Sequence, residues 1–391
     1  MEITIVGPSP EERQGGGVRT RTLVDVLESA GARVSGVYHS FHTSKFRIRL
    51  QNRGNASQWV SINFPNYWPR PLKAVSLIFI LAYAWRLSKR SDLILCTFGS
   101  ILFAMPAIIV SKVRGKPIAL DYIDTELYGV PESVCKYFLR KADLVFAISH
   151  YLADKAESYG CENVVYLPTF VNIEFFQMDV EAREKIRRKL GYRENDVVIG
   201  YAGSLAPFEG IPVLVQAFEA LTRKYANVRL AIVGRRLLGT DCDIPQLSKG
   251  VGLEDKIALI PPVPRVEYPK LLSAFDILCV PRTDCLMSRA ASPIKVTEYL
   301  SMGLPTVCSS IGEMSIIIRH KVNGFLAKPS DADDLASTLE EILLNPEYAR
   351  KVGSNGRKEV IEKYSFTIIG DEISRSLAKI VKRDGSANCK G

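Results

Sequence analysis

The sequence is poor in the residues that build metal and disulfide sites. Its eight cysteines are scattered without a CxxC pair, and its four histidines lack metal-ligand spacing. It also lacks a hydrophobic run of about 20 residues, the length needed to cross a bilayer. Residues 1–6 (MEITIV) have neither the basic region nor the cleavage site of a signal peptide. We therefore expect a cytoplasmic protein with reduced thiols and no metal.

Acidic residues are scarce in one part of the chain. Between residues 41 and 120, Asp92 is the single acid among twelve lysines and arginines. This window holds the whole positive excess of the chain, whose formal net charge is +9. Such asymmetry predicts an anionic partner, either a membrane surface, a phosphorylated lipid or a nucleic acid. Nucleic acid is disfavoured because the window contains no recognisable binding module and an apolar segment interrupts its charges.

That apolar segment, Ala74 to Trp85, allows two interpretations. It has the composition of a buried core helix. It also has flanking tryptophans and basic residues, which are typical of a helix lying in the headgroup region of a membrane. In the second case the protein would dock peripherally on the inner face of the membrane, through Arg47, Arg49, Trp68, Arg70, Lys73 and Trp85.

The chain of 391 residues is long enough for two domains with separate cores. Apolar strands alternate with helical patterns in both halves, which predicts two doubly wound α/β domains with open parallel sheets. We expect the first domain to span residues 1–172 and the second 173–365. Residues 366–391 carry a final amphipathic helix expected to pack back on the first domain. A cleft between the two domains is the expected ligand site.

Residues 292–310 (SPIKVTEYLSMGLPTVCSS) predict a helix, a turn and a strand. Ser292 suits the N-cap and Pro293 the first helical position, while Gly303 suits the end of the helix. Unpaired N–H groups at a helix start favour a phosphate. The segment therefore predicts an anion site at the amino end of this helix.

Lys295 and Glu298 lie on one face of the same helix. The lysine can bind a diphosphate, and the carboxylate can accept hydrogen bonds from two ribose hydroxyls. Together they predict a nucleoside diphosphate site. The same i, i+3 spacing is equally typical of an ion pair on a solvated helix, and that alternative stays open.

Two further groups lie where α/β proteins bind ligands. The glycines around Gly16 and Gly17 allow the backbone to approach a phosphate or sugar, although they match no dinucleotide or P-loop fingerprint. Asp121 and Asp124 follow a predicted strand, PIALDY, and could bind a substrate hydroxyl or take its proton. A flexible loop and loop-capping carboxylates are the plainer interpretations.

Several segments in this order resemble the retaining glycosyltransferases of the GT-B fold, over nearly the whole chain. They are the glycine loop, YAGSLAPFEGIPVLVQAF (201–218), VRLAIVG (228–234), AFDILCVPR (274–282), SPIKVTEYLSMGLPTV (292–307) and NGFLAKPSD (323–331). The resemblance implies two Rossmann-like domains, the first binding an acceptor and the second a nucleoside diphosphate sugar. It also implies metal-independent sugar transfer, with retention, to a hydroxyl of a glycan or lipid-linked acceptor.

The resemblance also implies roles for single residues. Glu298 would hold the donor ribose, and Lys295 with the amides around Pro293 and Ile294 would hold the diphosphate next to Gly203. Asp124 would touch the donor sugar or the acceptor hydroxyl, with Asp121 beside it as the second catalytic acid.

The chain departs from the family pattern at three positions. The usual first glutamate falls on Ala290, and the usual Arg and Lys that clamp the diphosphate fall on Ser204 and Glu209. Lys295 and Arg282 are placed to substitute for these cations. The departures leave a second hypothesis, a catalytically silent nucleotide-sugar-binding protein that acts as a partner or regulator.

Overall fold

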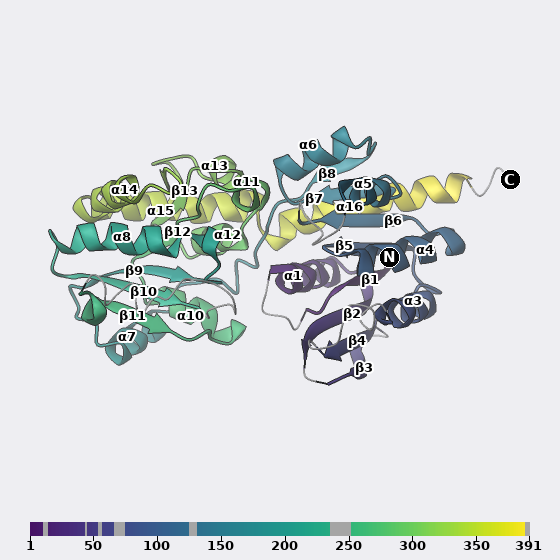
Figure 1. The fold of residues 1–391 in the computed structure, drawn as a ribbon, viewed down its shortest axis with the longest axis horizontal. Coiled ribbons are helices and arrows are strands. Elements are labelled where there is room, and N and C mark those ends of the chain that lie inside the picture. Colours follow the sequence, from purple (N-terminus) through teal and green to yellow (C-terminus); the bar gives the residue numbers. More distant parts are fainter. Residues whose placement is uncertain are drawn as a thin grey trace. The chain divides into compact units, whose positions relative to one another are not determined.

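The computed structural model contains two compact units, each built around one β-sheet (Figure 1). Unit 1 comprises Met1–Pro168 and Phe366–Gly391, and unit 2 comprises Thr169–Ser365. The structure describes residues 1–10, 15–43, 45–53, 57–65, 75–124, 131–234 and 252–387. The predicted α/β architecture with two parallel-sheet halves is confirmed, whereas the expected cleft between the halves stays a prediction.

The unit 1 sheet has the strand order β3-β4-β2-β1-β5-β6-β7-β8. Its strands are β1 (Glu2–Pro8), β2 (Arg33–Thr43), β3 (Arg47–Arg53), β4 (Ser57–Pro65), β5 (Leu93–Phe98), β6 (Ile118–Tyr122), β7 (Leu144–Ala147) and β8 (Val164–Tyr166). Every neighbouring pair is parallel except β3 and β4. The central strands β1, β5, β6 and β7 are buried almost throughout, as expected for a sheet covered on both faces.

Six helices cover this sheet within the part of unit 1 that the structure describes. They are α1 (Gly15–Ser29), α3 (Ser76–Leu87), α4 (Ile101–Arg114), α5 (Glu132–Leu139), α6 (His150–Ser158) and α16 (Phe366–Ala387). Helices α3 to α6 share one core with alternate residues of the central strands, whereas α16 packs on α1. Helix α4 begins at a serine cap, where the Ser100 hydroxyl accepts from the Leu102 N–H at 3.2 Å, and ends at Gly115 with φ 59°.

The unit 2 sheet is parallel throughout, with the strand order β11-β10-β9-β12-β13-β14. Its strands are β9 (Val197–Ala202), β10 (Val228–Val233), β11 (Ile257–Ile260), β12 (Ile277–Val280), β13 (Thr306–Ser309) and β14 (Phe325–Ala327). Gly200 in β9 lies directly against Phe275. A Cβ added at this position would stand 2.1 Å from the ring, so only glycine fits here. The centre of the sheet is therefore closely packed against the segment that precedes β12.

Helices cover both faces of the unit 2 sheet as well. They are α7 (Val180–Lys189), α8 (Ile211–Thr222), α10 (Tyr268–Ser273), α11 (Leu286–Ala290), α12 (Ile294–Ser301), α13 (Glu313–Ile317), α14 (Ala332–Leu344) and α15 (Pro346–Lys363). The described residues of the unit also form three 3₁₀ turns, η1 (Pro207–Glu209), η2 (Glu254–Lys256) and η3 (Arg265–Glu267). Helices α8 and α14 share one core, and α10 and α12 share another.

Candidate functional site

The candidate site lies at the carboxyl edge of the unit 2 sheet, where open α/β sheets bind ligands. The loop after β9 carries Ser204 and Glu209, and the segment after β11 carries Arg265. Arg282 follows β12, and α12 begins further along the same connection. Because parallel strands end at one edge, these distant segments are brought together.

Helix α12 begins differently from the prediction. Its N-cap is Pro293, and the Ser292 hydroxyl lies 3.2 Å from the hydroxyl of Thr169, so the prediction of Ser292 as the cap is wrong. Proline offers no side-chain acceptor, so the first amides of α12 have no capping side chain. The predicted end is confirmed, since Gly303 follows the helix with φ 72°.

A buried cluster of charges surrounds Glu209. One carboxylate oxygen, Oε2, lies 2.6 Å from the ammonium of Lys295. The other, Oε1, accepts from the Arg282 guanidinium at 3.3 Å and from the Ser204 hydroxyl at 3.1 Å. All three charged side chains are buried. Ser204 and Glu209 thus share one network with Lys295 and Arg282, the two cations that the sequence had suggested as substitutes.

The two cations decide the protonation of Glu209. Burial by itself would raise the pKa of this carboxyl, but Lys295 and Arg282 outweigh burial and lower the pKa to about 2. Burial lowers the pKa of Lys295, and the charge of Glu209 opposes this effect. With Glu209 ionised and both cations charged, the cluster keeps one net positive charge, which favours an anionic ligand.

The Lys295 side chain is held in place from two sides. Its ammonium donates to the Tyr201 hydroxyl at 3.0 Å and stands 4.8 Å from the centre of that ring. A Cβ on Gly203 would lie 2.6 Å from the ammonium nitrogen. Gly203 must therefore lack a side chain if Lys295 is to keep this position.

Glu298 pairs with a residue that the sequence analysis did not consider. Its Oε1 lies 2.6 Å from the Arg265 guanidinium, and its side chain is 2% exposed. Lys295 pairs with Glu209, so the alternative i, i+3 ion pair between Lys295 and Glu298 does not form. Burial raises the pKa of Glu298, while Arg265 and then Lys295 act in the opposite direction.

The loop between β12 and α12 also forms a shallow hollow of about 390 Å³. It is lined by Asp284, Cys285, Leu286 and Arg289. Arg289 donates to both oxygens of Asp284, at 2.8 and 3.0 Å. Ala290, where the family's first glutamate was expected, is buried at the end of α11.

In unit 1 the predicted glycines belong to a helix. Helix α1 starts at Gly15, so Gly16 and Gly17 lie in its first turn and not in a loop before it. A Cβ on Gly16 would lie 3.3 Å from Pro8 and 3.9 Å from Ile123. The start of α1 and the end of β6, which leads to Asp124, are therefore neighbours at the carboxyl edge of the unit 1 sheet.

Asp121 and Asp124 lie in different environments. Asp121 is fully buried, and Arg19 donates to its two oxygens at 2.9 and 3.1 Å. The same guanidinium donates to the carbonyls of Leu167 and Pro168. Asp124 is half-buried at the end of the segment that follows β6. Arg19 therefore links α1 to β6 through Asp121 and to the end of the first segment of unit 1 through Leu167 and Pro168, and Asp124 is the more accessible acid.

The predicted membrane-docking surface is described only in part, because Trp68, Arg70 and Lys73 lie outside the described residues. Arg47 and Arg49 lie on β3, which pairs with β4 alone. Helix α3 buries Ile80 and Ala84, so the core-helix interpretation holds for one of its faces.

The other face of α3 is exposed. Ile78 and Trp85 are 67% and 40% exposed, and the Arg114 guanidinium stacks 3.7 Å from the Trp85 ring centre. The exposed face therefore combines apolar side chains with a cation.

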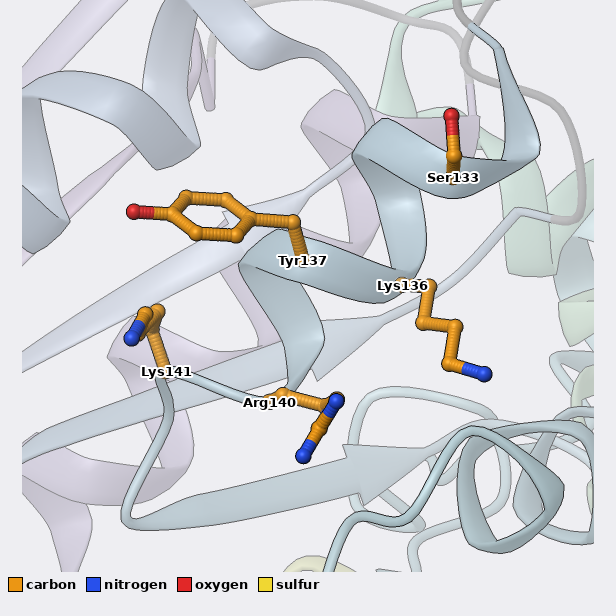
Figure 2. Close-up of a pocket in the computed structure, with 5 residues that line it drawn as sticks. All are labelled: Ser133, Lys136, Tyr137, Arg140 and Lys141. Atoms are coloured by element: carbon orange, nitrogen blue, oxygen red, sulfur yellow. The ribbon is translucent and has the colours of Figure 1, made fainter.

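A second basic surface, which the sequence analysis did not identify, lies on α5 and the two residues that follow it. A hollow of about 340 Å³ is lined by Ser133, Lys136, Tyr137, Arg140 and Lys141 (Figure 2). Figure 2 shows Tyr137 and Lys141 on one side of the helix and Lys136 on the other. The cations do not converge on one point, so this surface is an open basic face of α5.

Neither a metal site nor a membrane-spanning helix is found among the described residues. Within the described part of the chain, no group of three or more His, Cys, Asp and Glu side chains could hold a metal ion. No helix among the same residues is long and apolar enough to cross a membrane.

Comparison with known sequences gave consistent matches. Residues 182–359 match the family model described as glycosyl transferases group 1. An uncharacterized glycosyltransferase of Methanocaldococcus jannaschii is 28% identical over 200 residues, which cover 50% of this chain and 49% of that protein. The alpha-D-kanosaminyltransferase of Streptomyces kanamyceticus is 23% identical over 294 residues, 71% of this chain and 74% of that protein. The chain thus spans about half the length of the first relative.

Solved structures match over nearly the whole length. Sucrose-phosphate synthase from Thermosynechococcus elongatus has a TM-score of 0.80 at 18% identity, covering 98% of this chain and 99% of that one. Anabaena HepE, crystallised with UDP and glucose, has a TM-score of 0.77 at 18% identity, covering 97% and 100%. At such identities the likeness shows the fold alone. It covers the residues of both units.

Proposed function

We propose that the protein, whose residues 182–359 match the family model of group 1 glycosyl transferases and whose fold is GT-B, transfers a sugar from a nucleoside diphosphate sugar to a hydroxyl. One observation carries the proposal. Lys295 and Glu298, one turn apart on α12, are both buried at the carboxyl edge of the unit 2 sheet. Each has a partner of opposite charge within 2.6 Å that favours its charged form, so one ligand could meet a cation and a carboxylate there.

We propose that Lys295, Arg282 and the first amides of α12 bind the diphosphate, and that Glu298 accepts from the ribose hydroxyls. In the reaction, the bond between the anomeric carbon and the diphosphate oxygen breaks, and its electron pair stays with the leaving group. Buried cations stabilise the charge that develops there better than solvated ones would. The resemblance to the GT-B enzymes supports a metal-independent transfer with retention.

We propose that unit 1 binds the acceptor. The acceptor oxygen forms the new bond to the anomeric carbon and loses its proton, and we propose Asp124, the more accessible of the two acids, as the base that receives it. The basic and apolar surface of β3 and α3 supports a glycan or lipid-linked acceptor at an anionic membrane, with the protein bound peripherally at the inner face. Two relatives from Mycobacterium tuberculosis and Mycolicibacterium smegmatis, at 24% and 23% identity, are GDP-mannose-dependent phosphatidylinositol monomannoside mannosyltransferases.

The network around Glu209 bears on the alternative of a catalytically silent protein. Ser204 and Glu209 replace the family's expected cations, and Glu209 neutralises one of the two cations that remain nearby. This observation favours weaker diphosphate binding than in other members. The net positive charge of the cluster supports replacement of the usual clamp over its loss.

The test is release of nucleoside diphosphate from a panel of UDP, GDP and ADP sugars, with and without a membrane extract as acceptor. We expect release from one donor, dependent on the extract and abolished in Glu298→Ala. Glu219→Gln, which alters a half-buried acid on α8 outside the candidate site, is the matched control. Binding without release or transfer would favour the silent alternative, and the absence of both binding and release would contradict the proposal.

A further inference from the structure

Among the described residues, Arg265 is the cation from another element that pairs with Glu298. It belongs to η3, directly after β11 and the run PPVP, and its side chain is 33% exposed against 2% for Glu298. Its guanidinium lies near three rings, 4.9 Å from the centre of Phe176, 5.6 Å from Tyr268 and 5.7 Å from Phe175. The arginine is therefore oriented by an aromatic cradle on one side and by Glu298 on the other.

The pairing preserves acceptor capacity on Glu298. An ionised carboxylate offers about four lone-pair sites on its two oxygens, and Arg265 approaches one oxygen. The remaining sites suit the two donors of a ribose. A protonated carboxyl would lose part of this capacity, and burial pushes Glu298 toward that state.

We propose that Arg265 is a positioning residue of the nucleotide site, which keeps Glu298 ionised and oriented toward the ribose hydroxyls. This inference rests on the proposed function, because it assigns the ribose to Glu298. A positioning role of Arg265 can be distinguished from a purely structural ion pair by its dependence on the ligand. The contribution of Arg265 to binding should exist only for a ligand that carries ribose hydroxyls.

Among the described residues, three titratable groups interact electrostatically with Glu298, and two of them favour its ionised form. Arg265 from η3 and Lys295 from the same helix α12 favour the ionised form. Tyr268 of α10 is buried with a raised pKa, so it stays neutral near pH 7 and does not compete as an anion. Removing Arg265 takes away the larger of the two favourable charges, so Glu298 should then take up its proton at a higher pH.

The test compares Arg265→Met with the wild-type protein by calorimetric titration with UDP and with 2′,3′-dideoxy-UDP. The GDP and ADP pairs are run in parallel. We expect the Kd of the tightest ribonucleotide to rise about tenfold or more, as for a lost charge-assisted contact, and the Kd of its dideoxy analogue to stay unchanged. The loss should shrink as the pH is raised from 6 to 9, because Glu298 then ionises without help.

Two further variants keep the outcome unambiguous. Arg265→Lys retains the positive charge but not the planar guanidinium, so it should recover part of the ribonucleotide affinity. If Arg265→Met does not fold, Arg265→Lys is compared with the wild type instead. Lys270→Met, which removes an exposed cation from α10, is the matched control and should bind like the wild type.

The contradicting results are distinct. An equal loss for both nucleotides would make Arg265 a structural or phosphate-binding residue, and an unchanged Kd would remove its role altogether. If the wild type bound no nucleoside diphosphate, the proposed function would fail as well.

Discussion

Glu209 separates two buried cations, and its replacement should show how much the cluster contributes to stability. In Glu209→Gln, Lys295 and Arg282 would be buried side by side without a compensating charge. Breaking a buried pair in this way costs about 3–5 kcal/mol, which urea denaturation would measure. Glu219→Gln removes an exposed pair with Arg223 and should cost less than about 1 kcal/mol. Equal losses of unfolding free energy in the two variants would contradict the role of Glu209 as the anion between two buried cations.

The same residue predicts a dependence of stability on pH. The pKa of Glu209 is lowered from 4.5 to about 2, so its contribution is fully present above pH 4.5 and is lost as the pH falls through 2. The shift corresponds to about 3 kcal/mol. The difference in unfolding free energy between wild type and Glu209→Gln should therefore shrink over this range, and a constant difference would show that Glu209 is not ionised as described.

Asp121 and Asp124 should respond differently to substitution by asparagine. Asp121→Asn leaves the Arg19 guanidinium buried without its anion, which should lower the unfolding free energy by about 3–5 kcal/mol. Asp124→Asn should change stability by less than about 1 kcal/mol but reduce sugar transfer at least tenfold, since a positioned base contributes more than that. Denaturation and transfer assays on both variants check this. A stable and fully active Asp124→Asn would remove Asp124 from the catalytic proposal.

The sequence pointed to individual residues of the candidate site but not to their contacts. Lys295 and Glu298 were identified because helix caps and i, i+3 spacing are local signals. Their partners Glu209 and Arg265 lie on other loops, and only the sheet topology brings them close. Sequence position after β11 was a usable signal for Arg265, because residues at the ends of parallel strands meet at one edge.

At the scale of elements, the surface of β3 and α3 can be tested on vesicles. Replacing Arg47 and Arg49 by glutamine removes two cations from the edge strand. Each basic residue near an anionic surface is worth about 1 kcal/mol, so flotation with anionic liposomes should weaken roughly tenfold or more. The control is the double variant Arg350→Gln, Lys351→Gln, which removes the same number of positive charges. Both residues are exposed on α15 of unit 2. Equal binding of the two double variants would count against docking by β3.

Regular elements were predicted where the pattern is strong. Strand β9 begins and ends as predicted, because a continuous apolar run between loops is typical of a buried parallel strand. The β3–β4 hairpin was missed, although Arg47, Ile48, Arg49 and Leu50 alternate with period two. The basic side chains of this segment were interpreted as a charged surface alone. The start of α12 was misplaced because Ser292 bonds to Thr169, a partner 123 residues away.

At the scale of the molecule, alternating strands and helices were enough to predict two parallel sheets, because a parallel sheet needs a helix on each crossover. The antiparallel β3 lies outside this rule. The assignment of the acceptor to unit 1 and of the donor to unit 2 stays a prediction, since it depends on ligands and not on the fold.

The central claim is that Lys295 and Glu298 of α12 bind the diphosphate and the ribose of one activated sugar. A crystal structure of the protein with a bound nucleoside diphosphate tests it most directly. The account predicts a diphosphate oxygen within hydrogen-bond distance of the Lys295 ammonium and both ribose hydroxyls donating to Glu298, with Arg265 still paired. A nucleotide bound elsewhere, with Lys295 and Glu298 making no contact to it, would contradict the account.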